Sequence, residues 1–241
     1  MERKYINEIR VELSLPKDSY LKNIPALRYL ENGNVLKFDK DITFLVGENG
    51  VGKSTIIEAI AVASRINPEG GNANHMFSSC NTHSELNEYL DISLKGYPKE
   101  KYFLRAETFY NLATYLQSNA YFDYSGNLID YHEMSHGQSF LAAVQNLNGN
   151  GLYIFDEPEA ALSPLKLMTL MCEINRLANH NSQFIIATHS PILMTMPNSD
   201  VLSLSDNGIE KIDYTETEHY KISKMFLDYP ERMIKYLFEN E

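Results

Sequence analysis

The stretch Ile42–Thr55, ITFLVGENGVGKST, decides the fold of this chain. Gly47, four intervening residues and then Gly52, Lys53 and Ser54 form the complete P-loop pattern. An apolar run precedes the glycines and a run with helical periodicity follows them, as expected where a buried strand leads into a helix. An ordinary glycine turn before a helix seldom has all of these positions. We therefore predict a phosphate-binding loop.

The residue types of this loop suit a nucleotide with a divalent cation. Backbone N–H groups of a glycine turn and of a helix N-terminus converge on phosphate oxygens, where the helix dipole favours negative charge. Lys53 can place its ammonium beside the β- and γ-phosphates, and the Ser54 hydroxyl can ligate the Mg²⁺ that bridges them. We expect ATP and Mg²⁺ as the ligands. The predicted ATP-binding residues of the loop are Gly47, Glu48, Asn49, Gly50, Val51, Gly52, Lys53, Ser54 and Thr55.

Composition places the chain among globular proteins. It has 241 residues, of which 44% are apolar, so that one domain over 1–241 can build a sizeable core. No run of 18 apolar residues appears, and the N-terminus alternates polar and apolar residues, unlike a secretory signal. Cys80 and Cys172 form no CxxC pair and predict neither a disulfide framework nor a metal site. We expect a soluble cytoplasmic protein without a membrane segment.

The charge of the chain does not indicate a nucleic-acid partner. The formal net charge is −11, whereas phosphate backbones favour positive surfaces. Basic residues are scattered and form no stripe, although a local basic patch remains compatible with direct nucleic-acid binding.

Strands alternate with helices along the chain, which predicts a mostly parallel sheet covered on both faces. We expect loops at 16–33 and 67–82, and two final helices that pack without chemistry. The expected strands are 9–13, 35–38, 42–46, 89–94, 101–105, 152–155, 184–187 and 201–204, and the expected helices are 54–66, 108–117, 136–147, 164–179, 215–227 and 230–238.

Two carboxylates supply a second half of the site. Asp156 and Glu157 follow an apolar strand, whose carboxyl end lies beside the P-loop in a parallel sheet. Asp156 would hold Mg²⁺ through its water shell, and Glu157 would polarise the attacking water as a general base. His189 ends the next strand and can contact the γ-phosphate, although a lone histidine is more often a structural residue.

The motif Met134–Gln138, MSHGQ, resembles the signature motif of ABC-type ATPases. The P-loop, the signature motif, Asp-Glu-Pro and Thr-His follow one another here in the order that is typical of that family. The similarity extends from about residue 42 to residue 190. The run after Asp156 resembles the small AAA-type ATPases related to the RecF, SMC and OLD groups more than it resembles transporter subunits. The short span between Glu107 and Ser135 has no room for the long coiled coil of the SMC group.

The resemblance implies an ABC-ATPase-like P-loop NTPase fold with a small helical lobe at about 107–147. It also implies an ATP-dependent homodimer in which Ser135, Gly137 and Gln138 of one subunit contact the ATP of the other. Glu107, in the place of the family's usual glutamine, becomes a candidate metal ligand beside Ser54 and Asp156. His136 and Ser163 also depart from the family pattern, at positions where a glycine and an aspartate are usual.

Three functions fit these motifs. The leading prediction is an ATPase, converting ATP and water to ADP and phosphate, that acts as a switch on an unidentified protein partner. An ABC transporter would use the same domain as its ATP-binding subunit, but it would need a separate membrane protein. A small-molecule P-loop kinase is less compatible with the signature motif and His189.

Overall fold

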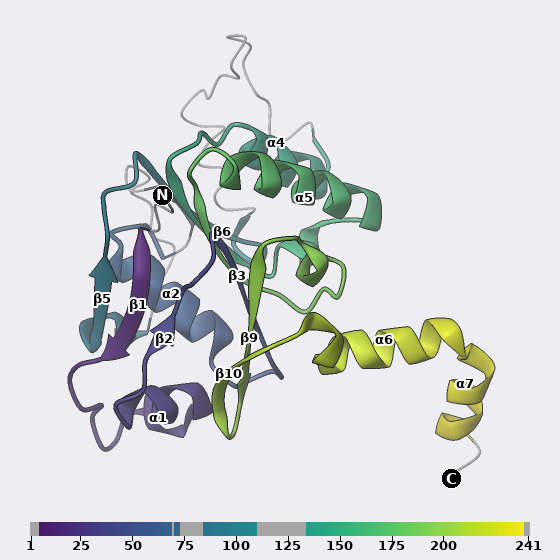
Figure 1. The fold of residues 1–241 in the computed structure, drawn as a ribbon, viewed down its shortest axis with the longest axis horizontal. Helices are drawn as coiled ribbons and strands as arrows, with labels where there is room; N and C mark the ends of the chain where they lie inside the picture. The colour runs from purple at the N-terminus through teal and green to yellow at the C-terminus, as the bar shows by residue number, and fades with distance from the viewer. Residues whose placement is uncertain (1–4, 69, 73–83, 110–133, 239–241) are drawn as a thin grey trace.

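The computed structural model describes residues 5–68, 70–72, 84–109 and 134–238. Its main sheet, seen in Figure 1, has five inner strands that pair in parallel and two edge strands that pair antiparallel. In spatial order the strands are β10 (Gly208–Ile212), β9 (Ser199–Ser205), β3 (Ile42–Val46), β8 (Gln183–Ala187), β7 (Gly151–Asp156), β6 (Glu100–Arg105) and β4 (Gly71–Asn72). The predicted α/β fold with a mostly parallel sheet is therefore confirmed.

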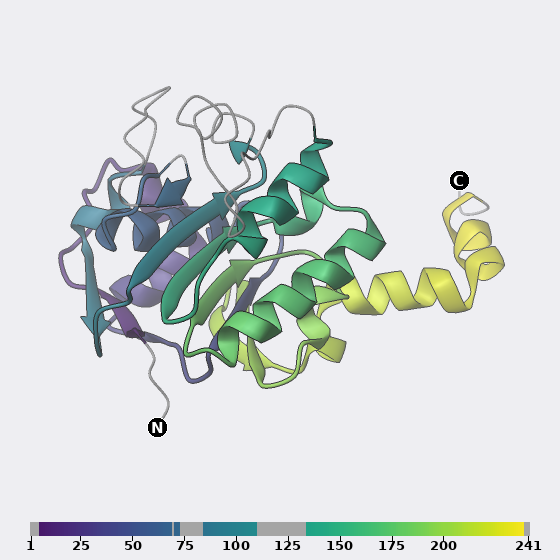
Figure 2. The ribbon, with the colours of Figure 1, turned by 90° about the horizontal axis from the view of Figure 1, so that it is seen from above.

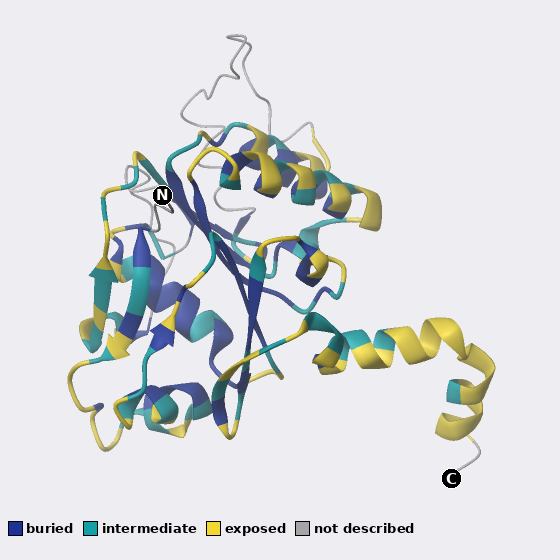
Figure 3. Ribbon diagram, in the orientation of Figure 1, coloured by how far each residue is buried: buried dark blue, intermediate teal, exposed yellow. Residues whose placement is uncertain are grey.

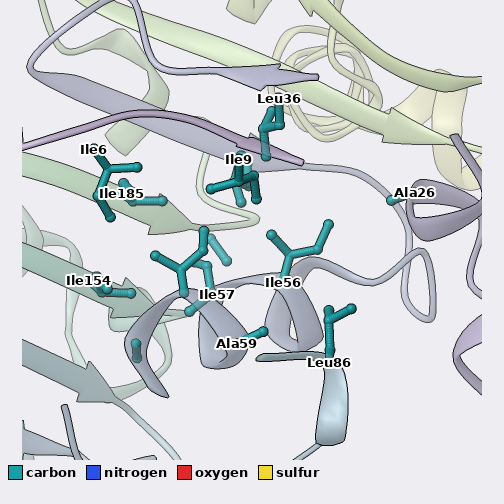
Figure 4. Packing of buried hydrophobic residues seen from close by; sticks show 14 of the residues in the cluster. Ile6, Ile9, Ala26, Leu36, Ile56, Ile57, Ala59, Leu86, Ile154 and Ile185 are labelled. Carbon is teal, nitrogen blue, oxygen red and sulfur yellow. The ribbon is translucent and has the colours of Figure 1, made fainter. Parts of the chain in front are cut away.

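Helix α2 (Lys53–Ala63) lies between the main sheet and a smaller antiparallel sheet. Its Ile56 and Ile57 belong to one apolar cluster with Ile9 of the small sheet and with Ile154 and Ile185 of the main sheet (Figure 4). Because both flanks of α2 are apolar, the helix is buried on nearly all sides and the loop before it is held firmly. The strands of the small sheet, in spatial order, are β2 (Leu36–Lys37), β1 (Ile6–Val11) and β5 (Leu90–Leu94).

Helices α4 (His136–Gln145) and α5 (Pro164–Ala178) pack on the opposite face of the main sheet. Successive residues of a strand point to opposite faces. Accordingly, Phe155 belongs to the cluster under α4 and α5, whereas its neighbour Ile154 belongs to the cluster around α2. The three central strands, β3, β8 and β7, are buried on both faces, as their continuous apolar runs predict.

Several predicted elements differ from the structure. The expected loop at 16–33 contains a 3-10 turn, Tyr20–Asn23, and α1 (Pro25–Glu31), because Pro25 is suited to a first helical position and three apolar residues follow it at helical spacing. Strand β10 is absent from the prediction because its edge sequence, GIEKI, is short and its two isoleucines do not alternate with polar residues. The helix expected at 108–117 and the polar stretch after it lie almost wholly outside the described residues.

Shorter 3-10 turns connect the larger elements. Their bounds are Glu85–Glu88, Pro158–Ala161, Leu193–Thr195 and Tyr214–Glu216. The P-loop helix begins at Lys53 and ends at Ala63, three residues before the predicted end, and β4 occupies two residues of the expected loop at 67–82.

The C-terminal arm, formed by α6 (Glu218–Asp228) and α7 (Pro230–Phe238), extends away from the rest of the chain (Figures 1 and 2). Neither helix contains a buried residue, and Figure 3 shows the arm as almost wholly exposed. The prediction of two packing helices is wrong in this respect. Among the described residues, no helix is both long enough and apolar enough to cross a membrane.

Candidate functional site

The glycine loop lies between β3 and α2, and its backbone leaves no room for side chains at two positions. A Cβ atom on Gly47 would lie 2.2 Å from the carbonyl oxygen of Leu204, and one on Gly52 would lie 2.4 Å from Ile24. Both glycines have positive φ, 145° and 107°, which other residues rarely adopt. The loop therefore leads directly into the N-terminus of α2, where free N–H groups can bind an anion.

Lys53 is held inside this loop. Its ammonium donates hydrogen bonds to the carbonyl oxygens of Gly47 at 2.8 Å and Glu48 at 2.9 Å, and only 5% of the residue is exposed. Burial lowers the pKa of Lys53, while Glu157 and Asp156 oppose this shift. The structure thus places a fixed cation where the sequence predicts phosphate groups.

Ser54 and Asp156 come together although they are 102 residues apart in the sequence. The Ser54 hydroxyl lies 3.1 Å from Oδ1 of Asp156, which ends β7 and is 4% exposed. Burial raises the pKa of Asp156 to about 6, against the opposing effects of Arg105 and of the hydrogen bond from Ser54.

A hydroxyl and a carboxylate at this spacing are ligands that suit Mg²⁺. The described residues contain no group of three or more His, Cys, Asp or Glu side chains that could hold a metal ion. The donor set therefore fits a Mg²⁺ that arrives with phosphate oxygens and keeps water ligands, with Ser54 and Asp156 as its protein side.

Arg105 links three carboxylates at the end of β6. Its Nη1 lies 2.9 Å from Glu58, and its Nε lies 3.3 Å from Asp156 and 3.8 Å from Glu107. The Glu107 side chain is 81% exposed, its contact with Arg105 is long, and its charge adds to the raised pKa of Asp156. The metal role of Glu107 stays a prediction, whereas Arg105 forms an ion pair with Asp156 and also contacts Glu58, a residue that the sequence did not single out.

Glu157 and His189 meet at the adjoining ends of β7 and β8. His189 Nε2 lies 3.3 Å from Oε1 of Glu157, and the Glu157 N–H donates to the carbonyl oxygen of Ala187 at 3.0 Å. Glu157 has a left-handed backbone, with φ 49° and ψ 51°, which turns the chain sharply after the strand. Glu159, whose pKa is raised by burial, accepts a hydrogen bond from the His189 N–H. We call Lys53, Ser54, Asp156, Glu157 and His189 the catalytic edge, after the ATP hydrolysis that the sequence predicts for this site.

His219 is a neighbour of this edge that the sequence did not predict. It lies in the first turn of α6, and its Nε2 is 2.7 Å from Nδ1 of His189. A cavity of about 690 Å³ is bordered by this turn and by the edge; its lining includes Glu48, Asn49, Glu157, His189, His219 and Ile222. No spacing pattern links positions 189 and 219, so only the folded chain reveals the contact.

The signature residues lie at the N-terminus of α4. The Ser135 N–H donates to the Gln138 side chain at 2.9 Å, and Lys166 donates to the Ser135 hydroxyl at 3.0 Å. Gly137 is packed closely, since a Cβ there would lie 2.6 Å from the carbonyl oxygen of Ala161. Within the described part of the chain, no hydrogen bond joins these residues to the catalytic edge.

The remaining loop residues have different environments. Glu48, Asn49 and Gly50 line a second cavity of about 570 Å³ beside the loop. Val51 is buried in the cluster around α2, so that only its backbone is available to a ligand, and Thr55 lies in the first turn of α2.

Two family models, both described as an AAA domain, match overlapping parts of this chain. The first covers residues 20–130, and the second, whose description adds the words "putative AbiEii toxin, Type IV TA system", covers residues 121–195. A curated relative, the chromosome partition protein Smc of Methanocaldococcus jannaschii, is 31% identical over 74 residues. That match spans 31% of this chain and 6% of the relative's length.

Solved structures show the same fold over nearly the whole chain. The structure of cbiO1 from Clostridium perfringens, part of the ABC transporter complex cbiONQ, has a TM-score of 0.51 at 16% identity and covers 98% of this chain and 99% of that one. An ATP-binding subunit of an ABC transporter has a TM-score of 0.50 at 14% identity and covers 95% and 100%. These findings show that the chain has the α/β fold of a P-loop protein, and that its sequence is similar to AAA-type domains and, over a short stretch, to the Smc relative.

Proposed function

We propose that this protein binds ATP with Mg²⁺, hydrolyses it to ADP and phosphate, and acts as a nucleotide-dependent switch on a protein partner. The main support is the catalytic edge, where a buried lysine, a serine–aspartate pair and a glutamate–histidine pair meet at the carboxyl ends of neighbouring strands. Phosphoryl transfer needs little covalent chemistry from a protein, so that placing charges and donors is the main requirement.

Each residue of the edge has a distinct role in this proposal. Bound Mg²⁺ would neutralise charge on the phosphates. Lys53 would exchange its two carbonyl contacts for β- and γ-phosphate oxygens. Glu157, whose side chain is 40% exposed, can accept a proton from an attacking water, and His189 can donate a hydrogen bond from Nε2 toward the γ-phosphate.

The signature helix supports a dimeric form of the active enzyme. Ser135 is exposed, and its hydroxyl contacts Lys166 rather than the catalytic edge of its own chain. A helix N-terminus with a serine hydroxyl is suited to a phosphate. We therefore place Ser135 and Gly137 of one subunit against the γ-phosphate that is bound to the P-loop of the other.

An ATP-binding subunit of a membrane transporter is the second candidate. The full-length likeness to the cbiO1 structure favours it, although a likeness at 16% identity shows the fold alone. Co-purification with a membrane protein would support the transporter, and release of free phosphate without such a partner would support the switch.

Two inactive variants test the shared site. Lys53→Ala removes the phosphate counter-charge, and Ser135→Trp blocks the signature contact, so that each homodimer should be inactive. In a mixture, one site of each mixed dimer has an intact P-loop from one chain and an intact signature from the other. Random pairing in a two-fold dimer should restore roughly a quarter of the wild-type phosphate release.

A second mixture provides the matched control. Lys53→Ala and Glu157→Gln both damage the P-loop half of the site, so that their mixed dimers should have no intact site. Differently tagged chains would show that mixed dimers form in both mixtures. Mixed dimers without recovered activity in the first mixture would contradict the shared-site geometry.

A further inference from the structure

The first turn of the C-terminal arm reaches the catalytic edge through one histidine pair. The His219 and His189 rings have centroids 4.5 Å apart and an interplanar angle of 58°, with His219 Nε2 2.7 Å from His189 Nδ1. The other ring nitrogen of His189, Nε2, faces Glu157 at 3.3 Å. Both nitrogens of His189 are therefore engaged, one by the edge and one by the arm.

The chemistry of the two partners fixes the proton positions on His189. An ionised carboxylate only accepts hydrogen bonds, so that the contact with Glu157 at 3.3 Å favours the tautomer of His189 that carries its proton on Nε2. In a neutral imidazole the other nitrogen is then an acceptor, and it requires a donor from His219 Nε2. Burial lowers the pKa of His189, with further lowering by Lys53 and His219, which agrees with a neutral ring.

We propose that His219 is a positioning residue, which holds His189 in the orientation and tautomer with the proton on Nε2, so that this proton, which faces Glu157 in the nucleotide-free chain, can be donated to the γ-phosphate when ATP is bound. This inference rests on the proposed ATPase function. A bare Nε2 would turn a lone pair toward phosphate oxygens and would repel them, so that the tautomer decides whether His189 helps or hinders.

The start of α6 is built to hold His219 in place. Thr217, which is 4% exposed, caps the helix by accepting from the Tyr220 N–H, and its hydroxyl donates to the carbonyl oxygen of Tyr214 at 2.7 Å. The Tyr214 and Tyr220 rings meet edge to face at 5.3 Å. Beyond this anchored turn the arm buries nothing, so that movement of the arm would act on His189 through His219.

Steady-state kinetics of His219 variants test the proposal. His219→Ala should lower kcat by roughly 10-fold, a typical effect of losing an outer partner of a site residue, while KM and the ATP dissociation constant stay unchanged. His219→Gln keeps a side-chain N–H donor and should recover much of the lost rate. His180→Ala, at the exposed end of α5, is the matched control and should not change kcat.

Nitrogen NMR of His189 gives a readout that does not depend on turnover. The ring should show a protonated Nε2 and an unprotonated Nδ1 in the wild type, and a mixture of tautomers in His219→Ala. An unchanged kcat, an unchanged tautomer, or a loss of ATP binding in His219→Ala would overturn the positioning role. If the wild type releases no phosphate at all, the proposed function fails, and the NMR result alone then decides whether His219 sets the tautomer.

Discussion

The catalytic edge and the C-terminal arm depart in opposite ways from the usual distribution of side chains between core and surface. At the edge, Lys53 and Asp156 are 5% and 4% exposed, although charged side chains are seldom so buried. In the arm, Leu227 and Phe238 are 82% and 74% exposed, although such side chains usually form a core. Burial of charged groups lowers the free energy of unfolding, whereas the exposed apolar side chains of the arm contribute nothing to the core. The two regions therefore differ in what a substitution should change.

The largest effect is expected for Glu157→Gln at the edge. The variant keeps the shape of the side chain but loses the charge that polarises water, so that ATP hydrolysis should slow by about 10²- to 10⁴-fold. Nucleotide binding should persist, because Ser54 and Asp156 are unchanged. Size-exclusion chromatography with light scattering should therefore show a dimer in ATP and Mg²⁺ and a monomer without nucleotide.

The control for this variant is Glu173→Gln, which removes an ion pair with Arg176 on the surface of α5. It should keep the wild-type rate. If Glu157→Gln binds ATP yet has the same mass with and without nucleotide, hydrolysis does not govern the assembly of the dimer.

The next effect concerns stability, and it is a gain: Asp156→Asn should make the nucleotide-free protein more stable. The folded-state pKa of Asp156, about 6, lies above its unfolded value, so that the folded protein binds this proton more tightly. The protonated carboxyl of Asp156 therefore contributes to stability at low pH, and this contribution is lost as the pH rises through about 6. Removing the charge should therefore raise the free energy of unfolding of the nucleotide-free protein at pH 7 by about 1–3 kcal/mol.

Chemical denaturation at pH 7 and at pH 4 measures this difference. The gain should shrink at pH 4, where the native carboxyl is already neutral. Asp200→Asn is the matched control, because Asp200 is also 4% exposed but lies 2.7 Å from Lys211; its substitution should lower stability. A loss of stability in both variants would show that burial of Asp156 is offset by its contacts with Arg105 and Ser54.

The smallest effect is expected for removal of α7 by ending the chain after Asp228. Because no residue of α7 is buried, the free energy of unfolding should change by less than about 0.5 kcal/mol. Ile174→Ala, in the fully buried core under α5, should in contrast lose about 2–5 kcal/mol. A drop above about 1 kcal/mol on removing α7 would mean that the arm stabilises the body of the protein.

The catalytic edge was largely predictable because its residues lie in local patterns. The P-loop of Gly47–Ser54 and the Asp156–Glu157 pair each follow an apolar strand, and the carboxyl ends of such strands meet in a parallel sheet. The order of the strands was not predictable, since β8 lies between β3 and β7 although it follows both in sequence. Periodicity reports which face of an element is apolar but not which element covers it.

The contacts that escaped prediction join residues far apart in sequence. His219 meets His189 across 30 residues, and Arg105 meets Glu58 across 47, with no repeating pattern in either case. The exposure of the arm escaped for a related reason. Its apolar residues have the spacing of an amphipathic helix that packs on a protein surface, but this spacing does not show whether such a surface is present in the folded chain.

The left-handed backbone of Glu157 has a consequence for engineering this protein. Among the residues that the structure describes, five other than glycine have positive φ, and three of them are asparagines, which tolerate this conformation well. Glu157 tolerates it poorly, so that a search for heat-resistant variants would favour glycine or asparagine at this position. Either choice would relax the turn after β7 and remove the carboxylate at the same time. Screens that reward only survival at high temperature should therefore keep this residue constant.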